Sequence, residues 1–364
     1  MDKKTPTTGI QRKKVLVCGL RKSGKTSALR VLIQGIAPKD TFYIETTTQI
    51  VKENVDTIIP LEVWDCPGST TAQNLGVPLS QFSSIVFFID IQDDYHLPIR
   101  RFYDLVVAAY DANITNLPFE VLVHKAEAHS EDYRIDNFRE IQQRIEDELY
   151  DHPSGSLHTF YPISYHMTSV YDHTTHEAFS RIVQRITSQL HVAALENLMN
   201  VLTPNCSMAK CFLFDVNLRI YVATDASPVD PGSYEACSEY VQTILTFARL
   251  YHMSSTLTSP TTPTPQNISG PPFQHNKPEA VSEVEPSGSR EELFPEGEWA
   301  SSFAQLAPET TLAYWQITGS LALVSLLRSD VFESKRGLIE YNVAYFRDAV
   351  QKIQRIVMNG GKLV

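Results

Sequence analysis

The residues best suited to chemistry form one glycine-bounded loop near the amino end. Residues 19–26 read GLRKSGKT and fit the phosphate-binding pattern G-x-x-x-x-G-K-[ST]. In such a loop the backbone N–H groups cradle phosphates, and the helix that follows points the positive end of its dipole at the anion. Lys25 is expected to reach the β- and γ-phosphates, and Thr26 is expected to ligate Mg²⁺. A chance match is the alternative, but the apolar run before the loop and the helical segment after it favour a phosphate site.

A second nucleotide-site pattern follows farther along the chain. Asp65 and Gly68, in the stretch WDCPG, fit D-x-x-G at the end of an apolar run. The Asp65 carboxylate can hold Mg²⁺ through water, and the Gly68 N–H can face a γ-phosphate. Taken alone, Asp65 would more often be a turn residue before a proline. Its place downstream of Lys25 makes the metal-site interpretation the better one.

The segments around these residues alternate between strand-like and helix-like character over residues 14–195. The expected strands are 15–17, 50–56, 61–66, 84–90, 119–124 and 158–164, and the expected helices are 25–35, 99–110, 136–150 and 177–190. This alternation predicts a doubly wound α/β sheet with ligand loops at the carboxyl ends of its strands. Gly19, Asp65, His124 and Ser169 all fall at such ends. Residues 43–48, rich in threonine, are expected to form a loop over the phosphates.

Residues 196–364 have a different character. Two strand-like runs, 211–217 and 219–224, are joined by a tight turn and followed by a helical segment at 234–251. A second strand pair at 311–317 and 320–327 precedes another helical segment at 342–357. Between them, residues 254–298 combine many prolines, serines and threonines with an acidic cluster, which predicts a disordered insert. The second half is therefore expected to be a smaller α/β domain interrupted by a long surface loop.

Composition excludes several function classes. The chain has 364 residues, of which 43% are hydrophobic, and a formal net charge of -11. Nucleic-acid binding is not expected, because it would need a basic stripe. The five cysteines are odd in number and form no C-x-x-C pair, which favours a reducing, intracellular compartment.

No membrane signal is expected at either end of the sequence. Residues 1–13 are interpreted as a flexible basic arm, because they lack an apolar core and have Asp2 where N-myristoylation requires glycine. The longest apolar run, within SLALVSLL at 320–327, is far shorter than the roughly 20 residues that span a bilayer. Direct membrane insertion is not expected, so membrane association would come through a partner.

Six stretches together resemble one family. They are GLRKSGKT, WDCPG, FFIDIQDDY at 87–95, VHK, TSVYDH at 168–173 and FLFDVNLRIYVATDASPVD at 212–230. With them the chain resembles the Rag GTPases of the C/D type, in particular the fungal counterpart that pairs with a Rag A/B-like subunit. The resemblance implies a Ras-like doubly wound P-loop GTPase domain over 14–195. It also implies a roadblock-type dimerisation domain over 196–364, containing the insert at 254–298.

The resemblance also implies roles for individual residues. Lys25, Thr47 and Gly68 would be catalytic, and Mg²⁺ would be held by Thr26, Thr47 and Asp65, with Thr46 or Thr48 as neighbours that could take the place of Thr47. The residues that would contact GTP or GDP are Arg21, Lys22, Ser23, Gly24, Lys25, Thr26, Ser27, Thr47, Gly68, His124, Lys125, Glu127, Thr168, Ser169 and Val170. Among them, Lys125 would lie along the guanine and ribose, and Glu127 would accept hydrogen bonds from the base.

Two positions depart from the family pattern. Glu127 stands where an aspartate usually takes two hydrogen bonds from guanine, so the loop has to shift to keep that geometry. Ser69 follows Gly68 where many members place a glutamine that orients the attacking water, and a serine side chain is too short for this. The departures leave guanine selectivity and intrinsic hydrolysis as open questions.

Three functions remain open at this stage. The first is a slow, activator-dependent GTPase switch that forms an obligate heterodimer with a Rag A/B-type subunit. By resemblance it would signal amino-acid supply to the TORC1 kinase complex, as a cytoplasmic protein recruited to the vacuolar or lysosomal surface through a membrane-anchored scaffold complex. The second is a pseudo-GTPase scaffold with static nucleotide binding, favoured by Ser69 and Glu127. The third is a metabolic P-loop kinase, which would require a substrate pocket and an arginine-bearing lid.

Overall fold

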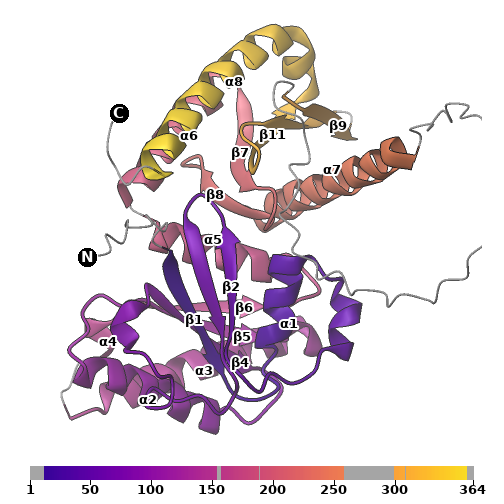
Figure 1. The fold of residues 1–364 in the computed structure, drawn as a ribbon. Helices are drawn as coiled ribbons and strands as arrows, with labels where there is room; N and C mark the ends of the chain where they lie inside the picture. The colour runs from indigo at the N-terminus through magenta and orange to yellow at the C-terminus, as the bar shows by residue number, and fades with distance from the viewer. Residues whose placement is uncertain (1–11, 154–156, 188, 258–298, 308, 359–364) are drawn as a thin grey trace, which may run out of the picture.

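The computed structural model describes residues 12–153, 157–187, 189–257, 299–307 and 309–358 (Figure 1). It contains two sheets with different construction. A six-stranded sheet has the order β2-β3-β1-β4-β5-β6, and a five-stranded sheet has the order β8-β7-β11-β10-β9. The strands of the first sheet lie between Lys13 and Thr168, and those of the second lie between Met208 and Arg328.

The first sheet is parallel except at one edge. Its strands are β1 (Lys13–Gly19), β2 (Val51–Asp56), β3 (Pro60–Asp65), β4 (Ser84–Asp90), β5 (Phe119–His124) and β6 (Ile163–Thr168). β2 pairs antiparallel with β3, and the other neighbours are parallel. All residues of β4 and β5 are buried, as expected for strands at the centre of a parallel sheet.

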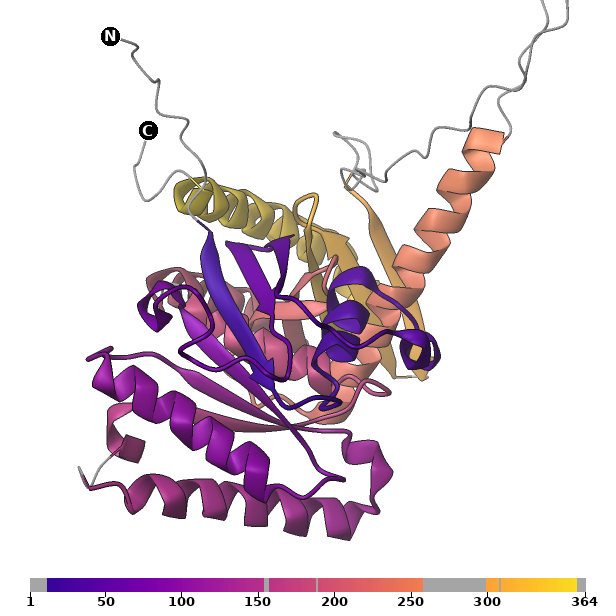
Figure 2. The same cartoon turned by 60° about the horizontal axis from the view of Figure 1, so that its bottom comes forward.

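Helices cover both faces of this sheet. They are α1 (Lys25–Leu29), which continues into a π-helix at Arg30–Gln34, then α2 (His96–Asp111), α3 (Glu131–Tyr150), α4 (Leu157–Phe160) and α5 (Thr174–Ile186). α2 and α3 lie side by side beneath one face (Figure 2), where Phe102 and Ile141 share a core with Phe87. α1 and α5 pack on the other face, where Ala28 and Phe179 join a second core.

The second sheet is entirely antiparallel. Its strands are β7 (Met208–Asp215), β8 (Ile220–Thr224), β9 (Ser301–Ala307), β10 (Thr310–Gln316) and β11 (Leu321–Arg328). Side chains alternate between its faces. Phe212 and Phe214 pack with Tyr234 of α7 (Pro231–Leu257), whereas Cys211 and Leu213 join the core formed with α6 (Gln189–Asn205) and α8 (Ser329–Met358).

The two sheets are joined through α5 and β8. The Tyr221 N–H donates a buried hydrogen bond to the Ser180 hydroxyl at 3.0 Å. The Arg219 guanidinium, in the turn before β8, donates to the Val31 carbonyl of the π-helix at 3.4 Å. One hydrophobic core therefore runs from the face of the first sheet covered by α1 and α5 to the face of the second sheet covered by α6 and α8.

The predicted fold class is confirmed, with several local corrections. The strand expected at 158–164 is wrong: α4 lies at Leu157–Phe160 and the strand follows at Ile163–Thr168. β6 is an edge strand whose residues are mostly half-buried, so it lacks the continuous apolar run that marks β4. α6 and β9 were not predicted. Residues 254–257, assigned to the insert, belong to α7, and residues 258–298 lie outside the described part of the chain.

Two further observations bear on the chain ends and on membranes. Of the arm assigned to residues 1–13, the structure describes Arg12, which forms an ion pair with Asp56 at 2.6 Å, and Lys13, which begins β1. Residues 1–11 lie outside the described residues. Among the helices that the structure describes, none combines the length and the apolar character needed to cross a membrane.

Candidate functional site

The glycine-bounded loop connects β1 to α1 in a conformation that requires its two glycines. Gly19 has φ 143° and Gly24 has φ 89°, both in the region that L side chains rarely adopt. A Cβ on Gly19 would lie 2.5 Å from the Phe88 carbonyl oxygen, and one on Gly24 would lie 2.5 Å from the His124 ring. The loop is thus pressed against the ends of β4 and β5. Its backbone curls around the start of α1, as a phosphate cradle requires.

Lys25 lies across this loop. Its Nζ donates to the carbonyl oxygens of Gly19 at 2.9 Å and Leu20 at 2.8 Å, and the residue is only 6% exposed. Burial lowers the pKa of the ammonium, although the nearby Asp65 carboxylate opposes that change. The cation is therefore held at the loop by neutral carbonyl oxygens and lacks a direct carboxylate bond.

Three oxygen-bearing side chains meet beside the loop. The Thr26 hydroxyl donates to Asp65 Oδ2 at 2.6 Å and lies 2.6 Å from the Thr47 hydroxyl, which is 3.4 Å from the same carboxylate oxygen. They come from α1, from the loop before β2 and from the end of β3, respectively. Burial raises the pKa of Asp65 in spite of the hydrogen bond from Thr26. Within the described residues, Asp65 Oδ1 is buried without a hydrogen-bond partner.

These three residues suit a hard divalent cation. Hydroxyl and carboxylate oxygens are the ligands that Mg²⁺ prefers, and the buried Oδ1 of Asp65 has unused acceptor capacity. Of the three neighbouring threonines considered for this role, Thr47 is the one whose hydroxyl contacts both Thr26 and Asp65 in the described part of the chain. The structure thus brings Thr26, Thr47 and Asp65 together, and their arrangement fits the predicted metal site.

Gly68 brings the D-x-x-G turn against the phosphate loop. A Cβ at this position would lie 2.3 Å from the Arg21 backbone nitrogen, so only glycine permits the approach. Ser69 follows it at the rim of a cavity of about 830 Å³. The predicted site residues that line the cavity are Arg21, Lys22, Ser23, Gly24, Lys25, Thr26, Ser27, Thr47, Gly68 and Lys125. The cavity has room for a nucleotide, since ligand pockets commonly enclose about 300 to 1,000 Å³.

The buried His124 side chain lies between Gly24 of the phosphate loop and Thr168 at the end of β6. Its Nδ1 lies 2.9 Å from the Thr168 hydroxyl, and its ring packs edge-on against Phe88 with centroids 5.2 Å apart. Burial, followed by the nearby Lys125 charge, lowers the pKa of the imidazole to about 3. The ring is therefore neutral at physiological pH and acts as a rigid spacer next to Gly24.

The remaining predicted residues lie around the far end of the site. Lys125 adopts a left-handed conformation with φ 63° and forms an ion pair with Asp90, the last residue of β4. Glu127 is exposed on a 3₁₀ turn at Ala126–Ala128, and Thr168, Ser169 and Val170 are buried. Neither Glu127 nor residues 168–170 line the cavity. Sequence reasoning missed Asp90, although an acidic residue at a strand's carboxyl end was a usable signal.

The chain matches proteins of known families along most of its length. The model described as "Gtr1/RagA G protein conserved region" matches residues 14–241. GTP-binding protein gtr2 of Schizosaccharomyces pombe is 36% identical over 348 residues, which cover 94% of this chain and 98% of the relative. Human Ras-related GTP-binding protein C is 32% identical over 346 residues, covering 93% of this chain and 76% of the relative. Mouse Ras-related GTP-binding protein D is 31% identical over 364 residues, covering 98% and 72%, respectively.

Proposed function

The chain belongs to the Gtr/Rag family of G proteins, similar to its Gtr2 and Rag C/D members, and from that premise we propose that it is a guanine-nucleotide switch. One observation carries the proposal. Thr26, Thr47 and Asp65 converge from three separate elements beside a glycine-bounded loop that holds Lys25. Such a convergence of a P-loop threonine, a second threonine and a strand-end aspartate suits Mg²⁺ and the phosphates of GTP.

At the phosphate end of the proposed site, different groups bind the phosphates, neutralise their charge and hold the metal ion. The backbone N–H groups of residues 21–26 bind the phosphates, and the Lys25 ammonium neutralises charge on the β- and γ-phosphate oxygens. Thr26, Thr47 and Asp65 would hold Mg²⁺, which when bound withdraws charge from the same oxygens. The Gly68 N–H would face the γ-phosphate. Because Lys25 already rests on carbonyl oxygens, it can exchange these weak partners for an anion without a buried carboxylate being left behind.

Two loops supply the switch. Residues 44–50 carry Thr47, and residues 67–77 contain Gly68 and Ser69; both segments contain little regular secondary structure. Contacts to a γ-phosphate and its Mg²⁺ order such loops, and loss of the phosphate releases them. Regulators that bind only one arrangement would read the nucleotide state from these loops.

We propose that hydrolysis is slow and depends on an activating protein. Ser69 cannot reach and orient a water as glutamine does, so the chain's own residues supply charge stabilisation but little positioning of the nucleophile. The same position favours the second candidate, a scaffold that binds nucleotide without turnover. A Ser69→Gln variant separates them, because it would accelerate hydrolysis by the GTPase but would leave the static binder inactive.

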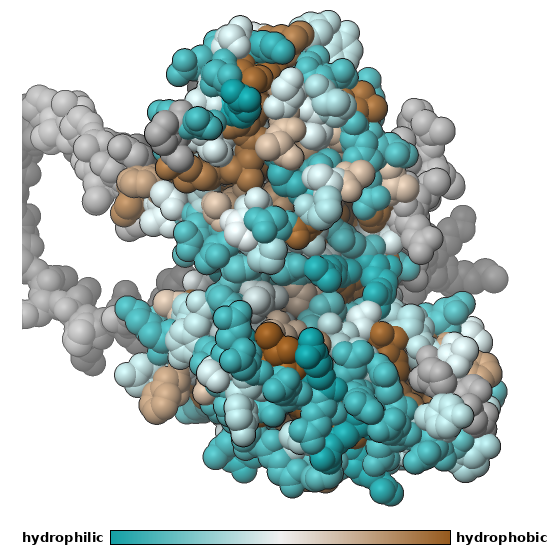
Figure 3. All heavy atoms as spheres, turned by 180° about the vertical axis from the view of Figure 1, so that it is seen from behind, coloured by the Kyte–Doolittle hydropathy of each residue, from teal (hydrophilic) through white to brown (hydrophobic). Residues whose placement is uncertain are grey.

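The proposed partner is a Rag A/B-type subunit bound through the second sheet. β9 lies at one edge of that sheet, and no strand among the described residues pairs with its outer side. Apolar side chains gather over this half of the molecule, whereas the first domain below it is mainly hydrophilic (Figure 3). Exposed examples are Phe247, Leu306, Leu338, Tyr341 and Tyr345. An edge strand that carries an exposed apolar side chain, as β9 carries Leu306, is suited to pairing with another chain.

The cellular role follows from family resemblance. As a heterodimer the protein would signal amino-acid supply to the TORC1 kinase complex from the cytosolic face of the vacuolar or lysosomal membrane. A membrane-anchored scaffold complex would recruit it. A test is amino-acid withdrawal in cells whose only copy of this protein carries Thr26→Asn; TORC1 output that responds as in the parent strain contradicts the role.

Nucleotide binding can be tested with the purified full chain and fluorescent GTP, GDP, XTP and ATP, each with and without Mg²⁺. The proposed switch binds guanine nucleotides tightly and needs Mg²⁺ to retain them. A preference for ATP would instead favour the metabolic kinase, and tight guanine binding without turnover, even with an activating protein, would favour the scaffold.

The partner can be tested by co-expression with a Rag A/B-type subunit followed by size-exclusion chromatography. We expect a stable one-to-one complex. Substitution of Leu306 by Glu on β9 should weaken it, while Glu140→Lys on α3, far from the second sheet, should not. A chain that elutes as a stable monomer beside the subunit contradicts the proposal.

A further inference from the structure

Lys125 is held by Asp90, a carboxylate in the stretch FFIDIQDDY to which the sequence analysis gave no role in the site. Its Nζ forms an ion pair with Asp90 Oδ2, and the Asp90 side chain is 5% exposed while that of Lys125 is 29% exposed. Asp90 is the last residue of β4, and Lys125 directly follows β5. The pair therefore bridges the loops that leave two neighbouring strands.

The position of Asp90 is fixed from two sides. In the sheet register Asp90 lies beside His124, and the Ile91 N–H continues the ladder by donating to the His124 carbonyl at 3.0 Å. The Gln92 N–H donates to Asp90 Oδ1 at 3.0 Å, which orients the carboxylate. One oxygen is thus bound to the backbone of its own loop, and the other is presented to the lysine.

The ion pair matters because a lysine side chain without a partner does not hold one position. Its ammonium sits on a flexible stem of four carbons, and freezing that stem costs conformational entropy. Lys125 also departs from the strand in a left-handed conformation, so the backbone alone does not direct its side chain along the cavity wall. A buried, oriented carboxylate restricts the ammonium to one place and leaves the apolar stem as a surface that lines the cavity.

We propose that Asp90 is a positioning residue for the nucleoside end of the nucleotide. It acts through Lys125, whose stem it holds where a guanine ring and ribose would lie. The inference rests on the proposed nucleotide binding. Since Asp90 does not line the cavity and the phosphates are held by residues 21–26, its loss should weaken retention of GDP and GTP by the same factor.

The test is a set of dissociation rates for fluorescent GDP and GTP, measured on the full chain in Mg²⁺ by chase with unlabelled nucleotide. Asp90→Asn keeps the shape of the side chain and removes its charge, and we expect about tenfold faster release of both nucleotides, the loss typical of one hydrogen bond to a charged group. Asp90→Glu should recover part of the retention. Asp93→Asn is the matched control, because it makes the same change on an exposed residue of the same loop and should leave the rates unchanged.

A double-variant cycle distinguishes positioning from a general structural role. If Asp90 acts through the lysine, Asp90→Asn combined with Lys125→Met releases nucleotide no faster than Lys125→Met alone. Multiplicative effects of the two changes would overturn the inference, and so would wild-type rates in Asp90→Asn. The double variant removes both charges of the pair, which keeps the test usable if Asp90→Asn alone fails to fold. A wild-type chain that binds no nucleotide refutes the proposed function instead.

Discussion

Two buried lysines in this protein lie near buried aspartates, with opposite arrangements. At the proposed nucleotide site, Lys25 donates to backbone carbonyls, and Asp65 keeps one carboxylate oxygen without a partner among the described residues. In the second domain, Lys210 and Asp225 form a direct ion pair at 3.1 Å, with side chains 6% and 5% exposed. The four residues are similarly buried, but their side chains differ in how completely they are hydrogen-bonded.

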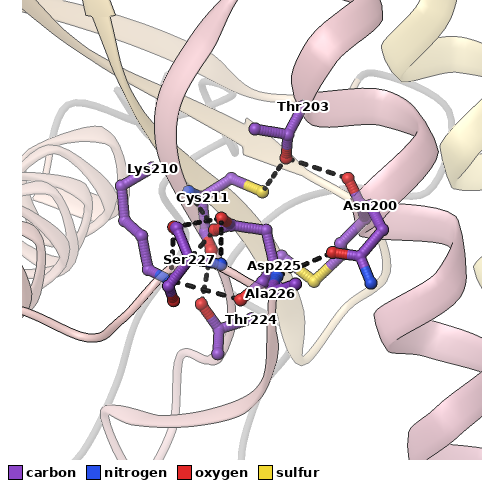
Figure 4. A network of polar contacts seen from close by, with 9 residues as sticks. Asn200, Thr203, Lys210, Cys211, Thr224, Asp225, Ala226 and Ser227 are labelled. Atoms are coloured by element: carbon purple, nitrogen blue, oxygen red, sulfur yellow. Dashed lines mark hydrogen bonds and ion pairs between the residues drawn. The ribbon is translucent and has the colours of Figure 1, made fainter.

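The Lys210–Asp225 network is closed, in the sense that the ammonium and both carboxylate oxygens have hydrogen-bond partners (Figure 4). The Lys210 Nζ also donates to the Ser227 carbonyl at 2.6 Å and lies 3.1 Å from the Ser227 hydroxyl. One oxygen of Asp225 accepts from the Cys211 N–H at 3.0 Å, and the other accepts from the Ser227 N–H at 3.1 Å and from its hydroxyl. The adjoining Ala226 N–H donates to Asn200 of α6 at 2.6 Å. The network ties β7, the segment after β8 and α6 together.

The difference separates the proposed binding site from a structural support. Burial raises the pKa of Asp65, so its charge disfavours the nucleotide-free fold. For Asp225, burial acts in the same direction, but hydrogen bonds from Ser227 and Cys211 and the Lys210 charge outweigh it and lower the pKa. A carboxylate with unmet hydrogen bonds is available to a cation, whereas a fully satisfied one contributes stability.

The largest expected effect comes from opening the closed network. Lys210→Met leaves Asp225 buried without its cation, which should lower the free energy of unfolding by about 3 to 5 kcal/mol. Urea denaturation followed by circular dichroism measures this loss. The folded fraction should still bind nucleotide, because the network lies in the second domain, away from the phosphate loop.

The control for that variant is Lys352→Met, which removes an exposed lysine that lies 3.9 Å from Asp348. It should change the unfolding free energy by no more than about 0.5 kcal/mol. Lys210→Met combined with Asp225→Leu should be less harmful than Lys210→Met alone, since no charge is then left unpaired. Equal stability of Lys210→Met and wild type would remove the distinction between the two regions.

The next effect is expected at the nucleotide site, with the opposite division between stability and binding. Asp65→Asn should reduce Mg²⁺-dependent nucleotide affinity by roughly 100-fold, as loss of a group that orients a bound metal does. The nucleotide-free variant should melt no lower than wild type at neutral pH, because a carboxylate disfavoured by burial has been neutralised. Titration calorimetry and thermal melting measure the two quantities on the same sample.

The exposed residue Asp93 again provides a control, since Asp93→Asn should alter neither quantity. A marked fall in the melting temperature of nucleotide-free Asp65→Asn would mean that Asp65 supports the fold as Asp225 does. The proposed difference in role between Asp65 and Asp225 would then be wrong.

The parts of the site that were predictable share a physical cause. Gly19, Gly24, Lys25 and Thr26 act through local backbone geometry, so their spacing in the sequence already carries the pattern. Asp65 and Gly68 are likewise fixed by one strand and its turn. For this reason the residues of the two motifs lie around one cavity, as their spacing in the sequence predicts.

The other parts depend on pairing between distant segments. Asp90 meets Lys125 only because β4 and β5 are neighbours in register, and Lys210 meets Asp225 only across the β7–β8 hairpin. Single-sequence patterns do not encode which side chains oppose each other across strands. The misplaced β6 and the missed β9 have a different cause: both are edge strands without a long apolar run.

A smaller effect is expected from removing one hydroxyl in each region. Ser227→Ala deletes the hydroxyl that contacts both Asp225 and Lys210, and should cost about 1 kcal/mol of unfolding free energy without changing nucleotide affinity. Thr47→Ala deletes a hydroxyl at the proposed metal site and should weaken GTP binding while changing stability by less than about 0.5 kcal/mol. Parallel denaturation and binding curves compare the pair. Loss of stability in Thr47→Ala, or of binding in Ser227→Ala, would contradict it.

The smallest effect is a difference in pH dependence, and its sign follows from the two aspartates. The pKa of Asp225 lies below its ordinary value of 3.8, so its contribution to stability is present above that pH and is lost as the pH falls through the folded-state pKa. The pKa of Asp65 lies above 3.8, so the nucleotide-free protein loses stability as the pH rises from 3.8 through the folded-state pKa.

Unfolding free energies measured by urea titration across this acidic range should therefore change slope in opposite directions in two variants. In wild type, Asp225 lowers the unfolding free energy as the pH falls below 3.8, and Asp225→Asn should remove this loss. Asp65 lowers the unfolding free energy as the pH rises above 3.8, and Asp65→Asn should remove that loss. Using differences from wild type cancels the titration of the other carboxylates, including Glu53, whose pKa is also raised by burial. Slope changes of the same sign would show that the two carboxylates experience equivalent surroundings. The unpartnered oxygen of Asp65 would then be no evidence for a cation site.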